Sequence, residues 1–177
     1  TGARRPRRQP TGAQHSNTAQ HLHRGQEARR HRRDDTTAMA SYYGLGIRAV
    51  ADSPTVIKEL EEQDDVGKLT LFGCGLRSLR GLPPLRQLTE LVLAANELGP
   101  SLDALFPALS NCTLLTKLDL SQNALESLMT KNRLPSLEVL DLSSNKLRSL
   151  DGLATFAPSL KKCKTQDNLE DLEWQND

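Results

Sequence analysis

VGKLTLFGCGLRSL, residues 66–79, carries a pattern that recurs three more times along this chain. The other copies are LTELVLAANELGPSL (88–102), LLTKLDLSQNALESL (114–128) and LEVLDLSSNKLRSL (137–150). Their shared form is L-x-x-L-x-L-x-x-N/C-x-L. Its first positions are Val66, Leu88, Leu115 and Leu137, so the copies are 22, 27 and 22 residues apart. A repeat of this length indicates stacked, similar structural units.

Each copy predicts one short strand with leucines on one side. Positions four and six are apolar, and a period of two places them on the same face of a strand. A single strand of this kind cannot bury its leucines, so the copies are expected to stack about 4.8 Å apart as a parallel sheet. We expect an α/β solenoid with this sheet on its concave face, 3₁₀ or short helices on its convex face, and an N-terminal helical cap.

A small polar residue follows each predicted strand, at position nine of the pattern. An asparagine there turns the chain inward, and its amide bonds backbone groups that would otherwise be buried without a partner. We interpret these residues as structural rather than catalytic, and expect them to stack as a ladder. The predicted ladder consists of Cys74, Asn96, Asn123 and Asn145.

Composition agrees with a repetitive aliphatic core of modest size. Leucine accounts for 32 of the 177 residues, and 29 of these lie between Leu69 and Leu172, whereas aromatic residues make up 3%. The length allows one domain, or one domain with a tail. The net charge of +1 combines two unlike parts, because residues 1–37 carry nine arginines and three acids while the rest carries 14 basic and 19 acidic residues.

Residues 1–38 form an Arg-rich segment with almost no apolar side chains, and we expect it to be disordered. Three functional interpretations compete: a basic arm for nucleic acid or anionic membrane, a transit segment, and a histidine metal site. The histidine spacings match no zinc pattern. A further hypothesis is that the segment is not native, because Met39 is the first methionine. Mass spectrometry of the native N-terminus would test it.

The expected boundaries follow from these patterns. They place a linker at 39–52, a capping helix at 53–65, four repeats at 66–159, and a degenerate fifth repeat with a C-terminal cap at 160–177. Ser53 is the predicted N-cap of the helix and Pro54 its first residue. At the other end, Leu169, Leu172 and Trp174 are expected to cover the last repeat. The alternative is that the chain is part of a longer solenoid.

Two connections between repeats carry their own predictions. Leucines from 76 to 91 recur every third residue, which favours 3₁₀-like turns there. The connection between the second and third copies is five residues longer and predicts a short α-helix behind Ser101, which Pro107 should kink or end.

The sequence offers little to an enzyme or a cofactor protein. From Met39 onward it has no histidine, and no Gly-rich phosphate-binding loop is present. Three cysteines at uneven spacings do not form a disulfide framework, which favours a reducing compartment. No apolar run reaches the ~20 residues of a membrane span. We therefore expect no catalytic activity, no cofactor, no metal and no membrane insertion.

Positions three, five and seven of the pattern point away from the core and define the concave face. They predict an apolar spot beside an acidic step formed by Asp119 and Asp141. Aligned acids on adjacent strands cost stability, and a basic partner would offset that cost. The alternative is a generic polar surface. The candidate partner-binding residues are Lys68, Phe72, Glu90, Val92, Lys117, Asp119, Val139 and Asp141.

The chain resembles the leucine-rich repeat proteins of the short, 22-residue type, above all the acidic leucine-rich nuclear phosphoproteins. SPTVIKEL (53–60), GLRSLRGLPPLRQLTELVLAANEL (75–98) and the longer connection before NCTLLTKLDLSQN (111–123) carry the resemblance. It implies a nuclear and cytoplasmic adaptor that binds histones and other basic proteins and is linked to phosphatase inhibition. The family's long Asp/Glu tail is missing, since this sequence ends in LEDLEWQND.

Two other families are similar in pattern: the leucine-rich regulatory subunit of protein phosphatase 1, and the A-prime subunit of a spliceosomal ribonucleoprotein. We therefore expect a monomeric, non-enzymatic adaptor for a basic protein, located in the nucleus, the cytoplasm or both. The alternative is a ribonucleoprotein-associated scaffold that contacts nucleic acid through residues 1–38. Salt-sensitive nucleic-acid binding that is lost when this segment is removed would favour the alternative.

Overall fold

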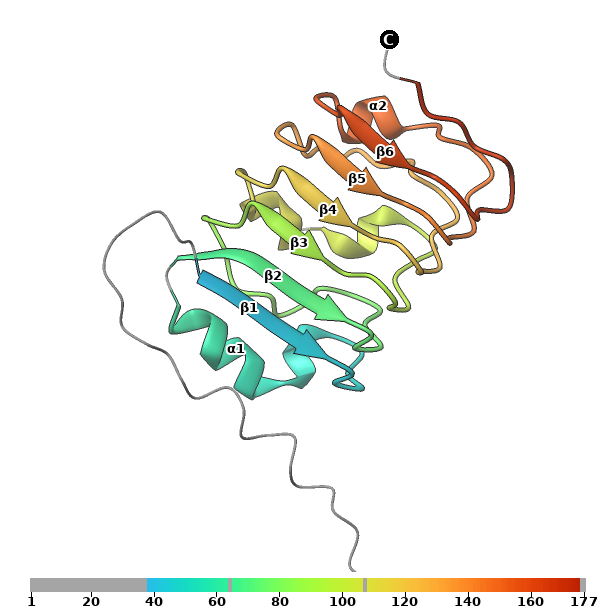
Figure 1. Cartoon of the computed structure of the whole chain (residues 1–177). Helices are drawn as coiled ribbons and strands as arrows, with labels where there is room; N and C mark the ends of the chain where they lie inside the picture. Colours follow the sequence, from blue (N-terminus) through green and yellow to red (C-terminus); the bar gives the residue numbers. More distant parts are fainter. Residues whose placement is uncertain (1–37, 64, 107, 176–177) are drawn as a thin grey trace, which may run out of the picture. The chain divides into compact units, whose positions relative to one another are not determined.

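A computed structural model describes residues 38–63, 65–106 and 108–175, all within one compact unit. In this part of the chain six parallel strands form one sheet in chain order (Figure 1). The predicted leucine-rich repeat solenoid is thus confirmed. The Arg-rich segment lies outside the described residues, except that Ala38 already belongs to the first strand. The strands are β1 (Ala38–Tyr43), β2 (Val66–Phe72), β3 (Glu90–Val92), β4 (Lys117–Asp119), β5 (Val139–Asp141) and β6 (Lys162–Lys164).

The leucines of the pattern stack in register beneath this sheet. Leu69 pairs with Leu91, and the row continues through Leu118 and Leu140 to Cys163 of β6. The four leucines are buried, whereas Cys163 is half-buried. A period of two therefore sends one set of side chains into a continuous core and the other set to the concave face.

A buried ladder of side-chain amides follows the strands. The Asn123 amide nitrogen donates to the carbonyl oxygens of Leu93 and Leu120, each at 3.0 Å, and its oxygen accepts from the Leu98 N–H at 3.0 Å. Asn96 and Asn145 make equivalent bonds between neighbouring repeats. Each amide thus satisfies backbone groups that the tight turn removes from the sheet.

The ladder has a fifth rung that the sequence analysis missed. Asn168 donates to the Leu142 carbonyl at 3.1 Å and accepts from the Leu147 N–H at 3.1 Å. It follows Leu160 by eight residues, which is also the interval from Leu137 to Asn145. This spacing could have identified Asn168 as the ladder residue of the degenerate fifth repeat.

The segment expected to be a linker, 39–52, begins instead with strand β1. Ala40 and Tyr42 stand where later repeats have two leucines, so the pattern was hidden. The following residues, YGLGIRAV (43–50), still align with FGCGLRSL (72–79), which follows β2. Gly44 and Gly73 share a left-handed backbone, with φ of 60° and 62°. β1 therefore begins a further repeat at the N-terminal side of the sheet.

Helix α1 (Pro54–Glu61) forms within the expected capping segment, but it follows the first strand rather than preceding it. A short 3₁₀ helix, η1 (Val50–Asp52), leads into it. The Ala51 N–H donates to the Arg80 carbonyl at 2.8 Å, so this segment stacks on the convex side of the next repeat. Pro54 is the first helical residue, as predicted, whereas Ser53 makes no capping bond with its side chain.

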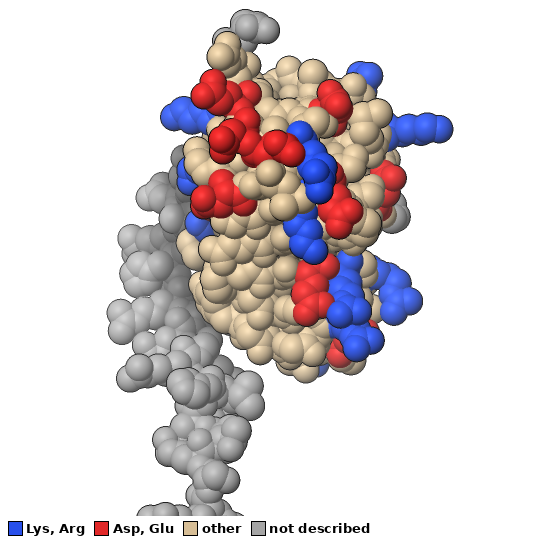
Figure 2. Space-filling view, turned by 90° about the vertical axis from the view of Figure 1, so that its right-hand side faces the viewer, with Lys and Arg blue, Asp and Glu red and all other residues tan. Residues whose placement is uncertain are grey.

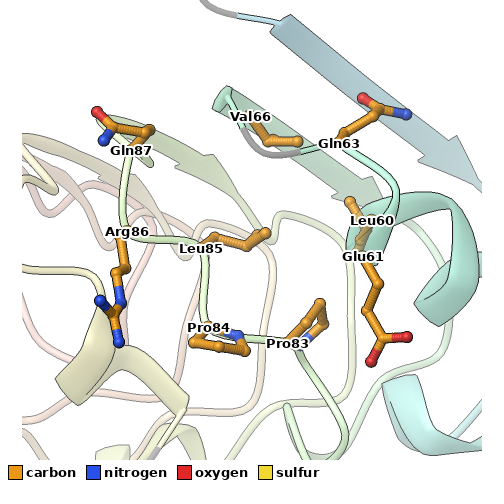
Figure 3. Close-up of a pocket in the computed structure, with 9 residues that line it drawn as sticks. All are labelled: Leu60, Glu61, Gln63, Val66, Pro83, Pro84, Leu85, Arg86 and Gln87. Carbon is orange, nitrogen blue, oxygen red and sulfur yellow. The ribbon is translucent and has the colours of Figure 1, made fainter.

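The stacking of α1 leaves a cavity of about 330 Å³ on the convex side (Figure 3). Leu60 and Glu61, at the end of α1, lie across it from Pro83 and Pro84. Adjacent prolines exclude a regular helix, and the segment there follows an irregular path. This segment contains isolated turns. In two of them the Leu82 N–H donates to the Leu79 carbonyl and the Leu88 N–H donates to the Leu85 carbonyl.

The longer second connection contains two 3₁₀ helices instead of the expected α-helix. These are η2 (Leu102–Leu105) and η3 (Ala108–Asn111), on either side of position 107. A proline at that position supplies no backbone donor, which disfavours one continuous α-helix. A short α-helix, α2 (Leu153–Phe156), lies instead after β5, in the connection to β6.

The C-terminal segment closes the far side of the sheet in part as expected. Leu172 and Trp174 pack partly buried against the core, and the Thr165 hydroxyl donates to the Leu172 carbonyl at 2.5 Å. Leu169, expected to join them, is 53% exposed. Its N–H donates to the Leu147 carbonyl at 3.1 Å, so it holds the position that the exposed residues Glu97 and Lys146 hold in earlier repeats. Among the described residues, no helix has the length and apolarity needed to cross a membrane.

Candidate functional site: the concave face

A hollow of about 450 Å³ lies over strands β3 to β6 on the concave face. Six of the eight candidate partner-binding residues line it, whereas Lys68 and Phe72 lie on β2, outside it. The strand register sets this arrangement, because it aligns positions three and five of neighbouring repeats in two rows. The six lining candidates are Glu90, Val92, Lys117, Asp119, Val139 and Asp141.

The row at position three alternates in charge. The ammonium of Lys68 lies 2.5 Å from one carboxylate oxygen of Glu90, and that of Lys117 lies 3.9 Å from the other. Glu90 thus bridges lysines from the strands on both sides of it. These partly exposed pairs contribute little to stability, but their charges neutralise one another.

The row at position five contains the expected acidic step. Asp119 of β4 and Asp141 of β5 are direct neighbours in register. Each Oδ1 accepts two bonds from the serine two residues later. Ser121 donates to Asp119 from its N–H at 2.9 Å and its hydroxyl at 2.7 Å, and Ser143 donates to Asp141 in the same way. The serines fix both carboxylates at the end of their strands.

The two aspartates differ in whether a lysine pairs with them. Lys164 of β6 lies 2.9 Å from Oδ2 of Asp141. Burial alone would raise the pKa of Asp141, but the hydrogen bonds from Lys164 and Ser143 outweigh it and hold this pKa below its ordinary value. The same contact raises the pKa of Lys164, with a smaller contribution from Asp119. This lysine, from the degenerate repeat, was missing from the candidates although its register places it beside Asp141.

Asp119 has no basic side chain within 4 Å in the part of the chain that the structure describes. Its neighbour on β3 is Val92, which is half-buried. Of the two acids, Asp119 is therefore the one with a carboxylate oxygen available to an external cation.

The concave charge is mixed rather than acidic. Lysines at 68, 117, 162 and 164 face acids at 90, 119 and 141 on the six described strands. The expected acidic step is real but local, because neighbouring lysines neutralise Glu90 and Asp141. Figure 2 shows acidic side chains gathered instead toward the C-terminal end of the molecule, where Asp167, Glu170, Asp171 and Glu173 line another hollow.

The predicted apolar spot extends into an aromatic pair. Phe72 is 41% exposed, and its ring centroid lies 6.3 Å from that of Tyr43 on β1. Thr70 and Ala94 hold positions five and seven of the pattern, which were expected to face outward, but both residues are buried. Tyr43 is not among the predicted residues because the repeat pattern does not predict strand β1.

The remaining chemistry on this face is limited. Burial, and to a lesser extent the charge of Asp141, raises the pKa of Cys163 to about 12, so its thiol is protonated at neutral pH. Within residues 38–63, 65–106 and 108–175, no group of histidine, cysteine and acidic side chains is arranged to hold a metal ion.

Comparison with known proteins agrees with the repeat pattern. A family described as Leucine Rich Repeat matches residues 136–162, and another described as Leucine Rich repeat matches residues 111–127. Acidic leucine-rich nuclear phosphoprotein 32-related protein 2 of Caenorhabditis elegans is 42% identical over 80 residues, covering 44% of this chain and 35% of that protein.

Two plant proteins are also similar. Acidic leucine-rich nuclear phosphoprotein 32-related protein 1 of Oryza sativa subsp. japonica is 35% identical over 83 residues, covering 47% of this chain and 17% of its own length. The 187-kDa microtubule-associated protein AIR9 of Arabidopsis thaliana is 38% identical over 76 residues, covering 42% of this chain and 4% of its own length. The chain thus spans about a third or less of each relative. With six stacked strands, an amide ladder and these matches, it is a leucine-rich repeat protein related to the acidic leucine-rich nuclear phosphoproteins.

Proposed function

We propose that this protein is a non-enzymatic adaptor whose concave face binds a basic segment of a partner protein. The proposal rests on the environment of the Asp119 carboxylate. Its Oδ1 is fixed by Ser121, and no described lysine or arginine pairs with it. A lysine or arginine of the partner would place its charged group on Asp119 and its aliphatic stem on Val92.

The surrounding residues favour a mixed contact rather than a purely electrostatic one. Val92 and Val139 are half-buried beside the acidic step, and Phe72 adds apolar surface on β2. Buried apolar contact supplies most of the affinity at an interface, whereas charges set specificity and the rate of association. A segment with one cation and adjacent apolar side chains would satisfy both parts.

The names of two relatives guide the choice of partner and compartment. Both are called nuclear phosphoprotein-related, which supports a nuclear location for this chain. Histones are abundant basic proteins of that compartment and are the first partner class to test. Regulation of a phosphatase remains a further expectation from the same resemblance, and no contact on the concave face is specific to it.

Isothermal titration of the full chain with a histone mixture tests the proposal. Asp119→Lys should weaken binding by about tenfold or more, because like charges across an interface cost several kcal/mol. Asp119→Asn should weaken it less and Asp141→Asn least, since Lys164 already occupies Asp141. Lys131→Glu, at an exposed site outside the concave face, is the charge control. Equal affinity for Asp119→Lys and the unaltered chain would move the binding surface elsewhere.

A further inference from the structure

Strand β1 has an edge that no described strand covers, because the sheet order begins with it. In later repeats, residues at position three donate their backbone N–H to the preceding strand. Lys117 donates to Thr89 O and Lys162 to Glu138 O, each at 3.0 Å. Met39 holds position three in β1, since it pairs with Lys68. Its N–H therefore points to the open edge.

The alternation along β1 gives the remaining groups of this edge. Gly44 donates its N–H to Phe72 O at 3.2 Å, so even-numbered residues face β2. The backbone N–H and C=O groups of odd-numbered residues therefore point away from β2, toward the open edge. The open edge of β1, formed by the backbone N–H and C=O groups of Met39, Ser41 and Tyr43, is thus a template for one more strand.

Soluble proteins usually block such edges with lysine, proline or a bulge. The strand sequence AMASYY contains neither residue type. Its one irregularity lies between Ala38 and Met39, so the part from Met39 to Tyr43 is regular. The edge is therefore suited to pairing rather than protected from it.

Side chains beside the open edge select one kind of strand on the concave side. Met39 and Tyr43 are each 65% exposed, and Tyr43 lies against Phe72. An added strand would place alternate side chains next to these residues, where apolar ones pack best.

The acidic residues near β1 determine which side chains suit the alternate positions of an added strand. Tyr42 points to the opposite side of β1, where its hydroxyl donates to Glu59 of α1 at 2.9 Å. The described residues from 52 to 65 carry five acids and a single base, Lys58. An added strand would direct its intervening side chains toward this acidic segment. Lysine or arginine fits there.

We propose that the open edge of β1 binds an extended segment of a partner protein in which apolar residues alternate with lysine or arginine. Main-chain bonds to the edge would supply affinity, and the two side-chain rows would supply specificity. A second copy of this chain fits poorly, because pairing two β1 edges would bring two acidic α1 segments together. The edge of β1 does not include Asp119, and Phe72 is the residue that borders both surfaces, so variants of Asp119 distinguish this site from the concave-face proposal.

Fluorescence anisotropy with a short synthetic peptide of alternating valine and lysine tests this site on the full chain. Ser41→Pro should lower affinity by about tenfold or more, since proline removes an N–H that faces the open edge and is tolerated at such positions. Ser41→Ala is the matched control and should bind as the unaltered chain does. Glu59→Gln should lower affinity less, while keeping an acceptor for Tyr42.

A second probe covers the case in which Ser41→Pro fails to fold. The same peptide with alternate backbone nitrogens methylated should lose binding to the unaltered chain. The chain has two methionines, and the methyl resonance of Met39 should shift on binding while that of exposed Met129 stays fixed. Absence of peptide binding, equal affinity for the methylated peptide, or loss of binding in Asp119→Asn would overturn the proposal. A dimer seen by sedimentation and abolished by Ser41→Pro would also overturn it, in favour of a second copy.

Discussion

The two ends of the sheet depart from the repeat pattern in opposite ways. At the N-terminal side, β1 spans six residues, carries no charge and exposes Met39 and Tyr43. At the C-terminal side, β6 spans three residues and presents two lysines, Lys162 and Lys164. The segment after β6 folds back on the last repeat through Thr165 and Trp174.

The difference teaches how a stack of equal units ends. Lysines on a short strand and a covering segment discourage further pairing at β6. β1 has neither device, although α1 covers the convex side of its repeat. The side chains of the end strand and any segment that covers it therefore decide whether that end of the sheet can pair with another strand. Three predictions test this comparison, from the largest expected effect to the smallest.

The central repeat provides the reference against which both ends are measured. Leu120 is fully buried, and Leu120→Asp should unfold the domain because an unpaired buried carboxylate costs several kcal/mol, about 4 or more. Asp119→Ala, one residue away but on the concave face, should change the free energy of unfolding by less than about 1 kcal/mol. Thermal melts followed by circular dichroism would measure both. Similar losses at the two positions would refute the register.

The amide ladder should weaken toward the C-terminal end. Asn145 is buried between two complete repeats, and Asn145→Ala should cost about 2–3 kcal/mol because it leaves buried backbone groups unpaired. Asn168 is only half-buried in the last repeat, so Asn168→Ala should cost about 1 kcal/mol. Urea unfolding of both variants gives the comparison. A larger loss at Asn168 would mean that the last repeat holds the stack together.

Acid should selectively weaken the C-terminal end of the concave face. The pKa of Asp141 is lowered in the folded protein, so its contribution to stability is present above the unfolded value of about 3.8 and is lost as the pH falls through the lower folded value. The unaltered chain should therefore exceed Asp141→Asn in stability near neutral pH, and the difference should shrink below about pH 4. A constant difference between the two at all pH values would exclude the Lys164 pair as its source.

Much of the fold was predictable because the repeat pattern has a leucine at nearly every core position from β2 to β5. β1 was missed because Ala40 and Tyr42 replace two leucines and remove the strand signal, although Gly44 and Gly46 still mark the turn. Asn168 was missed because its repeat is degenerate. The extra connection was given the wrong helix type because apolar spacing does not distinguish an α-helix from two short 3₁₀ helices.

The placement of the candidate residues on the concave face was predictable, but their balance of charge was not. The register alone brings Asp119 next to Asp141, and the structure has the same pairing. Lys164 lies beside Asp141, whereas no described basic side chain lies within 4 Å of Asp119, and this difference depends on side-chain conformation across three strands. The register of the degenerate repeat places Lys164 beside Asp141, but the repeat pattern does not specify the ion pair that its side chain forms. The sequence pattern therefore predicts two equivalent aspartates, whereas in the structure Asp141 pairs with a lysine and Asp119 has no described ion pair.

Valine methyl resonances test the proposed concave binding surface most directly. The chain has five valines. Val92 and Val139 flank the acidic step on the concave face, whereas Val50, Val56 and Val66 are buried near the N-terminal end. During titration of the full chain with a basic partner such as the histone mixture, the methyl signals of Val92 and Val139 should shift in step with binding, and the other three should stay fixed. Saturated binding with unchanged Val92 and Val139 signals would contradict the account.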